Sequence, residues 1–337
     1  MSEGQRYQWV DYAKGICILA VVCLYVRGNA DSYFGSSGLV QYFVEFARPF
    51  RMPDFFLLSG LFLARVIDKP LKHYLDRKVL HYLYFFLLWT FISWLLLILT
   101  GKLNEDPGDL IKSLISMTIV WPYHQLWFIL MLPLYFFATR LTRRVPAWIM
   151  FPLLCGLHIL QSYPQLQLGW GVANNFNERF VFFYAGYIFA PLIFSFAEKI
   201  KQHILLSVGG IALWFVVNSW LVFNGFSKTG IATLVLGFVG CFAVIAIAVL
   251  LMQCRTGFKW LSYLGAHSIA IYLPFDWILT GLSAVFFPLM PSININLYVL
   301  LMTVLTVVLS VAFYWICRPT PIAKWMFIRP YWIRLVK

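Results

Sequence analysis

The chain has 337 residues, of which 61% are hydrophobic and 12% are charged, whereas soluble domains are roughly half apolar and a quarter charged. This composition excludes an ordinary soluble protein. The net charge of +13 would suggest nucleic acid as a partner of a soluble domain, but here the basic residues flank long apolar runs. We therefore expect contact with membrane lipids and no nucleic-acid partner.

The apolar runs predict an all-α, polytopic transmembrane helix bundle of about ten spans. A bilayer core about 30 Å thick needs about 20 apolar residues per span, so ten spans and short loops account for residues 1–337 as a single integral membrane domain. The first run follows the polar stretch Met1–Gln8 directly and is expected to remain in the mature protein. The expected spans lie near residues 15–33, 50–66, 80–100, 123–139, 146–162, 179–196, 204–224, 229–251, 264–288 and 293–316.

With these spans, nineteen of the 26 Lys and Arg residues fall on one side of the membrane. The positive-inside rule makes that side cytoplasmic, and both termini are then predicted to be cytoplasmic. The nineteen residues are Arg6, Lys14, Arg65, Lys69, Lys72, Arg77, Lys78, Arg140, Arg143, Arg144, Lys199, Lys201, Arg255, Lys259, Arg318, Lys324, Arg329, Arg334 and Lys337.

The first expected span carries Lys14 near its start and Tyr25 eleven residues later. At a rise of 1.5 Å per residue, Tyr25 lies about 16 Å beyond Lys14, near the middle of the bilayer. A tyrosine has a pKa of about 10 in water and is a poor general base at neutral pH. Tyr25 is therefore either a packing residue or a group with a role other than that of an ordinary base.

The second expected span begins with two arginines and an aspartate, Arg48, Arg51 and Asp54. Charges at that depth are costly in a bilayer and mark functional sites. Because Asp54 follows Arg51 by three residues, the two side chains share one helical face, and we expect an ion pair that keeps the carboxylate charged.

The third expected span opens with the basic stretch Asp76–His81. Arg77 and Lys78 in this stretch suit the phosphates of a nucleotide-containing ligand, since Arg binds phosphate through two hydrogen bonds and Lys adds a point charge. The other interpretation is a cluster that sets topology and binds anionic lipid.

Four further polar residues precede or enter later spans on the outer side. His124 and Trp127 open the fourth span within Trp121–Phe128, and Arg179 opens the sixth span after Glu178. Asp276 follows Pro274, which should interrupt its helix and free backbone carbonyls nearby. The topology places these residues, together with Arg51 and Asp54, in the outer half of the bundle, and His124 is equally consistent with an aromatic belt at the membrane surface.

Several of these segments, in this order along the chain, resemble the motifs of the acyltransferase-3 family of integral membrane acyltransferases. The most specific is Phe55-Phe56-x-x-Ser59-Gly60 with its arginine-rich lead. Weaker matches are Lys14 to Tyr25, Asp76 to His81, His124-x-Leu126-Trp127-Phe128, Arg179 with the following Phe183-x-x-Gly186, and Gly265-x-x-Ser268 with Ile271-Tyr272-Leu273.

This resemblance implies an O-acyltransferase in the bacterial cytoplasmic (inner) membrane. It would move an acyl group of the acetyl or succinyl type from cytoplasmic acyl-CoA, a co-substrate and not a bound cofactor, to a hydroxyl of an extracytoplasmic glycan or lipid-linked sugar. It also implies a channel from the basic inner face to the outer pocket. The expected donor-binding residues are Lys14, Arg77, Lys78 and His81; the expected substrate-binding residues are Arg48, Ser59, Trp127, Arg179 and Asp276.

The chain departs from the family at one position, because Tyr25 stands where the family has the histidine that activates the acceptor hydroxyl. Asp54 or His124 is then the expected substitute base, with Tyr25 and Arg51 as further catalytic candidates and Arg48 and Arg51 as oxyanion-stabilising groups. Alternatively, the chain has lost the chemistry and acts as a transporter, flippase or binding subunit. The six cysteines lack metal-ligand spacing, and we expect neither a metal site nor disulfides.

Overall fold

A computed structural model describes residues 7–34, 38–103, 106–254, 257–289 and 293–336, and over these residues every regular element is helical. The all-α class is therefore confirmed. The α-helices are α1 (Gln8–Phe34), α2 (Leu39–Ala47), α3 (Arg51–Gly60), α4 (Leu71–Tyr74), α5 (His81–Leu99), α6 (Pro107–Ile115), α7 (Trp127–Leu141), α8 (Ala147–Gln161), α9 (Gly171–Ile188), α10 (Ala190–Gln202), α11 (Ile204–Phe223), α12 (Gly230–Gln253), α13 (Lys259–Ala266), α14 (Ser268–Tyr272), α15 (Phe275–Leu289) and α16 (Ile295–Cys317).

Among the described residues, six helical segments are long and apolar enough to cross a membrane, and a seventh is counted if α9 and α10, bent by 73°, form one span. The expected number of ten is not confirmed by this measure. The other expected spans are short or interrupted, as α8 has 15 residues and α2 is separated from α3 by a turn. Likewise α14 and α15 are separated at Leu273 and Pro274, where proline has no N–H to continue the helix.

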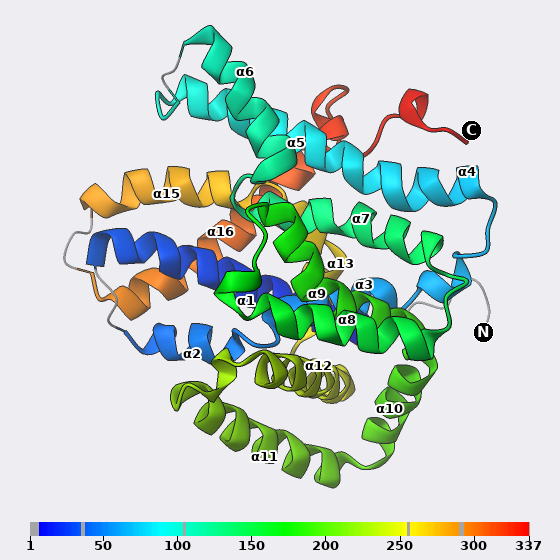
Figure 1. The fold of residues 1–337 in the computed structure, drawn as a ribbon. Coiled ribbons are helices and arrows are strands. Elements are labelled where there is room, and N and C mark those ends of the chain that lie inside the picture. The colour runs from blue at the N-terminus through cyan, green and yellow to red at the C-terminus, as the bar shows by residue number, and fades with distance from the viewer. Residues whose placement is uncertain (1–6, 35–37, 104–105, 255–256, 290–292, 337) are drawn as a thin grey trace.

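Helix α1 lies in the middle of the bundle, where it contacts α3, α12, α13 and α16 (Figure 1). Glycines allow the closest contacts between helix backbones. A Cβ on Gly15 would lie 2.2 Å from the Leu261 carbonyl oxygen of α13, and one on Gly60 would lie 2.1 Å from the Phe183 carbonyl oxygen of α9. The helices can approach to this distance only because these positions have no side chain, as is common in membrane bundles.

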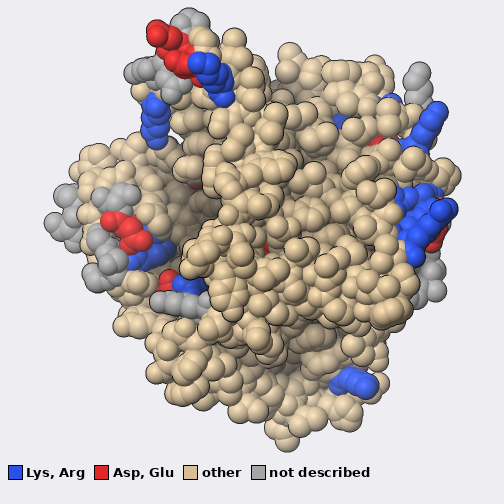
Figure 2. Space-filling view, in the orientation of Figure 1, with Lys and Arg blue, Asp and Glu red and all other residues tan. Residues whose placement is uncertain are grey.

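The two ends of the described chain lie at the same end of the bundle, and Lys and Arg side chains gather there (Figures 1 and 2). We call this the basic end. Arg143 pairs with Asp68 at 3.3 Å, and Arg140 donates to the Lys69 carbonyl at 3.0 Å, so loops far apart in sequence meet at this end. Three of the nineteen expected inner residues, Arg6, Arg255 and Lys337, lie outside the described residues.

The contact between α1 and α13 leads to a stability prediction. A Cβ on Gly265 would lie 1.7 Å from the Asp11 carbonyl oxygen, so Gly265→Ala should force the helices apart and destabilise the protein by about 1–3 kcal/mol. Gly209→Ala is the matched control, because nothing lies within 4 Å of its Cβ position and alanine favours a helix. Thermal unfolding in detergent should give a lower midpoint for Gly265→Ala alone; equal midpoints would contradict the packing described.

Candidate active site

The side chains of five helices meet around Tyr25 in the half of the bundle away from the basic end. The ring of Tyr25 packs edge-on against Phe275 at 5.1 Å, and its hydroxyl interacts with the Trp127 side chain. Asp276, Arg51 and Arg179 lie near enough to interact electrostatically with this hydroxyl. The structure therefore brings together five of the residues expected from the sequence, which are Tyr25, Arg51, Trp127, Arg179 and Asp276.

His124 joins this group through Asp276. Its Nδ1 atom lies 3.4 Å from both carboxylate oxygens of Asp276, and its ring stacks on Tyr123. The His124 side chain remains 58% exposed, whereas that of Asp276 is 7% exposed. A buried carboxylate at Nδ1 orients the ring and leaves Nε2 as the nitrogen available to accept a proton, which is the arrangement of a general base.

The backbone at His124 is unusual. This residue begins the short helix η4 (His124–Leu126) with a φ of +35°, and it is the one non-glycine residue with positive φ among those described. Such conformations cost free energy and are concentrated at functional sites, where surrounding structure holds them in place. Here the pairing with Asp276 supplies part of that constraint.

Arg179 is held from three directions. Its guanidinium carbon lies 4.6 Å from the centre of the Trp127 ring, and Nη1 lies 2.6 Å from both Glu178 Oε2 and Asn175 Oδ1. The stacking and the hydrogen bonds fix the plane of the guanidinium group. Arg179 is thus held against Trp127 in the group around Tyr25, and its expected role in substrate binding stays a prediction.

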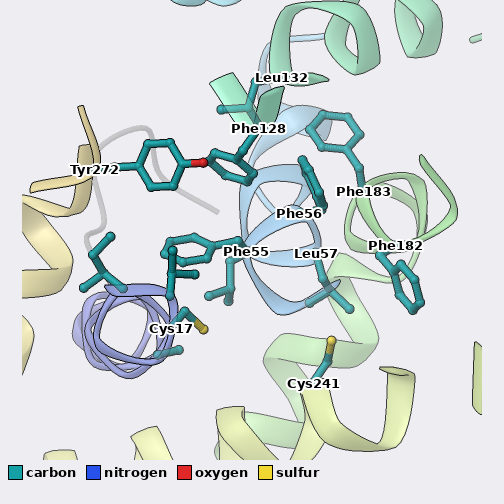
Figure 3. Close-up of a cluster of buried hydrophobic side chains, with 14 of the residues drawn as sticks. Cys17, Phe55, Phe56, Leu57, Phe128, Leu132, Phe182, Phe183, Cys241 and Tyr272 are labelled. Atoms are coloured by element: carbon teal, nitrogen blue, oxygen red, sulfur yellow. The ribbon is translucent and has the colours of Figure 1, made fainter. Parts of the chain in front are cut away.

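The expected ion pair between Arg51 and Asp54 does not form within the described part of the chain. Arg51 Nη1 donates to the Val44 carbonyl at 3.2 Å, whereas the wholly buried Asp54 carboxylate accepts from the Cys17 thiol of α1. Three residues along a helix leave an offset of about 60°, enough for Arg51 to turn back to the α2–α3 turn while Asp54 faces α1. Figure 3 shows Cys17 in the hydrophobic core beside Phe55. Asp54 is therefore separated from the group around Tyr25.

Two other expected substrate-binding residues also lie elsewhere. Arg48 pairs with Glu45 at 3.1 Å and lies 3.4 Å from Ser227, with nearly half of its side chain exposed. Ser59 donates to the Phe55 carbonyl at 2.7 Å and faces a narrow cavity on the side of the basic end. A serine hydroxyl within a helix commonly donates to the carbonyl four residues earlier. The contacts of Arg48 and Ser59 are thus with residues outside the Tyr25 group.

The four expected donor-binding residues line neighbouring cavities on the side of the basic end. A cavity of about 770 Å³ is lined by Arg77, Lys78 and His81, and a second of about 430 Å³ by His81 and Lys14. A third, of only about 50 Å³, is lined by Lys14 and Ser59. Because successive cavities share lining residues, they are neighbours, and together they extend from the basic end towards the centre of the bundle.

Aromatic rings separate the last of these cavities from the Tyr25 group. Phe55, Phe128 and Tyr272 line the narrow third cavity and contact one another in Figure 3. The Tyr272 ring lies 5.8 Å from Phe275, which in turn contacts Tyr25. The cavities end at these rings, and a channel that continues to the outer pocket stays a prediction. On the other side of the bundle, Figure 2 shows a hollow between the surface over α1 and α15 and the surface over α8 and α9.

Two features of the site were not identified from the sequence. Gln125 is fully buried beside His124, and neither of its side-chain amide atoms has a hydrogen-bond partner in the described structure; its place between His124 and Trp127 was the available signal. Arg329 reaches from the C-terminal segment to Asp76 at 2.8 Å. A pairing across 253 residues has no local sequence signal.

The family of acyltransferase domains matches residues 7–315. The inner membrane protein YcfT of Escherichia coli strain K12 is 22% identical over 310 residues, which cover 80% of this chain and 78% of YcfT. No solved structure matches the chain. With the long apolar helices, this relative confirms an integral protein of the bacterial inner membrane.

The wall of the large cavity gives the second prediction. Asp76 and Arg329 are 4% and 6% exposed and are hydrogen-bonded to each other, and Asp76 also accepts from the Leu335 N–H. Asp76→Ala leaves a buried guanidinium unpaired, which costs about 3–5 kcal/mol, and should release the C-terminal segment to limited trypsin cleavage after Lys324 or Arg334. Asp68→Ala, at an exposed pair, should leave cleavage unchanged. Equal cleavage of both variants would contradict this anchoring.

Proposed function

The chain belongs to the acyltransferase-3 family, and from that premise we propose that it is a membrane O-acyltransferase. It takes an acyl group of the acetyl or succinyl type from cytoplasmic acyl-CoA and transfers it to a hydroxyl of an extracytoplasmic glycan or lipid-linked sugar. The observation that carries this proposal is the pairing of His124 with Asp276 beside Tyr25 and two arginines. This group can replace the family histidine that the chain lacks.

The orientation in the membrane is part of the proposal. The basic end is cytoplasmic by the positive-inside rule, and the chain crosses the membrane about ten times, with α2–α3, α8, α9–α10 and α13–α15 as the short or interrupted crossings. Both termini are then cytoplasmic, and the Tyr25 group opens away from the cytoplasm.

The donor enters from the basic end. The phosphates of acyl-CoA bind Arg77 and Lys78 in the 770 Å³ cavity, since both charged groups suit phosphate. The Lys78 amine lies 5.0 Å from the Phe136 ring, which holds its position, whereas Arg77 is exposed. The acyl chain then points along the two smaller cavities, past Lys14 and Ser59, towards the rings of Phe55, Phe128 and Tyr272.

The chemistry is a direct transfer between a thioester and an alcohol. His124 Nε2 takes the proton of the acceptor hydroxyl while the hydroxyl oxygen attacks the thioester carbonyl carbon, so that a C–O bond forms and the carbonyl becomes an oxyanion. The guanidinium groups of Arg51 and Arg179 stabilise that negative charge in a site of low dielectric. The C–S bond then breaks, and the proton passes from His124 to the thiolate of coenzyme A.

Tyr25 has a positioning role in this scheme. Its hydroxyl lies under the influence of Trp127, Asp276 and both arginines, and a neutral phenol donates a hydrogen bond to the acceptor or to the oxyanion without being deprotonated. Asp276 keeps the His124 ring oriented and stabilises the imidazolium that forms during the reaction.

A non-catalytic transporter, flippase or binding subunit is the second candidate, favoured by Tyr25 in place of histidine and by the rings that separate the cavities from the Tyr25 group. The two candidates differ in one respect, because only the enzyme makes an ester from acyl-CoA.

The base assignment gives the third prediction. In proteoliposomes with labelled acetyl-CoA and a glycan acceptor, His124→Gln should lower kcat by roughly 10²–10⁴-fold, the contribution of general base catalysis. Asp276→Asn should also lower kcat, with little change in KM for acetyl-CoA, because Asp276 acts through His124.

His203→Gln is the matched control, as His203 lies at the α10–α11 junction. Full activity of His124→Gln contradicts the assignment, and activity that appears only in Tyr25→His supports the non-catalytic candidate.

Donor binding gives the fourth prediction. Arg77→Gln should raise KM for acyl-CoA about two- to fivefold with kcat unchanged, since a solvent-exposed ion contact contributes about 0.2–1 kcal/mol. The effect should shrink as salt is added, because exposed charges are screened. Arg144→Gln, at an exposed position in another loop, controls for the overall surface charge. An equal change in both variants would contradict a specific contact at Arg77.

A further inference from the structure

A second polar cavity lies between α8, α9 and α12, away from the route described for the donor. It has a volume of about 320 Å³, and all eight of its lining residues are polar: four amide side chains, two hydroxyl side chains, one histidine and one glutamate. A cavity of this kind inside an apolar bundle requires either ordered water or a ligand rich in hydrogen-bonding groups, because polar groups without partners are costly there.

The walls of the cavity are held in place by their own hydrogen bonds. His158 on α8 contacts the Glu178 carbonyl oxygen through Nδ1 and lies 3.0 Å from the Thr233 hydroxyl of α12 through Nε2. These contacts join three helices and use both nitrogens of the histidine, so His158 positions the wall rather than facing a ligand.

Gln161 is the exception. This side chain is 7% exposed and lines the cavity, yet its amide nitrogen has no hydrogen-bond partner within the described ranges. A buried unsatisfied amide costs about 1–3 kcal/mol, and an oxygen of a bound molecule would remove that cost. Ser162, the next residue, lines the same cavity.

The cavity adjoins the Tyr25 group through Arg179. Asn175 and Glu178 both line the cavity, and the side-chain oxygen atoms of both lie 2.6 Å from Arg179 Nη1. The charge of Glu178 is therefore balanced by Arg179, and the remaining lining groups are neutral. A molecule bound here touches the residues that hold Arg179 over Trp127.

We propose that this cavity binds an uncharged, hydroxyl-rich unit of the acceptor, a neutral sugar ring next to the one that is acylated. That the bound sugar belongs to the acceptor rests on the proposed function. The ligand class does not, because it follows from the neutral amides and hydroxyls of the lining and from their unpaired donor. The volume is at the lower end of the range for ligand sites, about 300–1,000 Å³, which suits one ring. A ring bound here lies beside Asn175 and Glu178, which hold the guanidinium group of Arg179.

The test measures sugar binding without any acyl donor. The full chain in nanodiscs of phosphatidylethanolamine and phosphatidylglycerol is titrated with maltose, lactose and N,N′-diacetylchitobiose by saturation-transfer NMR, and with glucose 6-phosphate as a charged probe. Gln161→Leu removes the unpaired donor with little change of size, Ser162→Leu fills the cavity without altering His158 or Gln161, and Gln202→Leu at the end of α10 is the matched control. Thermal unfolding checks that each variant is folded.

We expect at least one neutral disaccharide to bind, Gln161→Leu or Ser162→Leu to weaken its affinity at least tenfold, and Gln202→Leu to leave it unchanged. Absence of binding by all three disaccharides, binding of the charged probe alone, or unchanged affinity in both cavity variants would overturn the inference and leave a water-filled cavity. Acyl transfer is assayed separately. Sugar binding without acyl transfer contradicts the proposed enzyme activity but supports the sugar site, whereas acyl transfer without sugar binding contradicts the sugar site alone.

Discussion

The structure depends on the cost of placing ionisable side chains among apolar helices. An unpaired charge near the middle of a bilayer is expensive, and each buried acidic group among the described residues has a partner: Asp276 with His124, Asp76 with Arg329, and Asp54 with the Cys17 thiol. Each partner comes from a different helix or segment. The polar groups therefore fix how the helices meet, and the ones that keep an exposed face, above all His124, are available for chemistry.

Interrupted helices place these groups inside the bundle. Pro274 ends α14 just before Asp276, the turn between α2 and α3 supplies the Val44 carbonyl to Arg51, and the positive φ of His124 precedes α7. A continuous helix would direct its backbone groups into its own hydrogen bonds. These helix breaks leave backbone groups without intrahelical partners and redirect side chains inward. Helix α1 is unbroken; it carries Tyr25 into the same centre and is packed against its neighbours through glycines.

The sequence predicted the features that depend on local pattern. Hydropathy predicted the helical class, the motif Phe55 to Gly60 predicted the family, and the helix break at Pro274 is observed. The roles of His124 and Arg179 in catalysis and binding stay predictions. Prediction from the sequence failed where tertiary contacts decide. Spacing alone suggested that Arg51 would pair with Asp54, but packing of α3 against α1 directs Asp54 to Cys17. Spacing also could not reveal that Arg329 pairs with Asp76, because 253 residues separate the two.

The proposed function requires that the acyl group of a donor entering at the basic end pass along the cavities and between the rings of Phe55, Phe128 and Tyr272 to the Tyr25 group. Photo-crosslinking with an acyl-CoA that carries a diazirine at the acyl terminus, mapped by mass spectrometry, measures this directly. The account predicts labels on Phe55, Phe128, Tyr272 or His124, suppressed by excess acetyl-CoA. Labels confined to the lipid-facing helix α11, or labels that acetyl-CoA does not reduce, would contradict it.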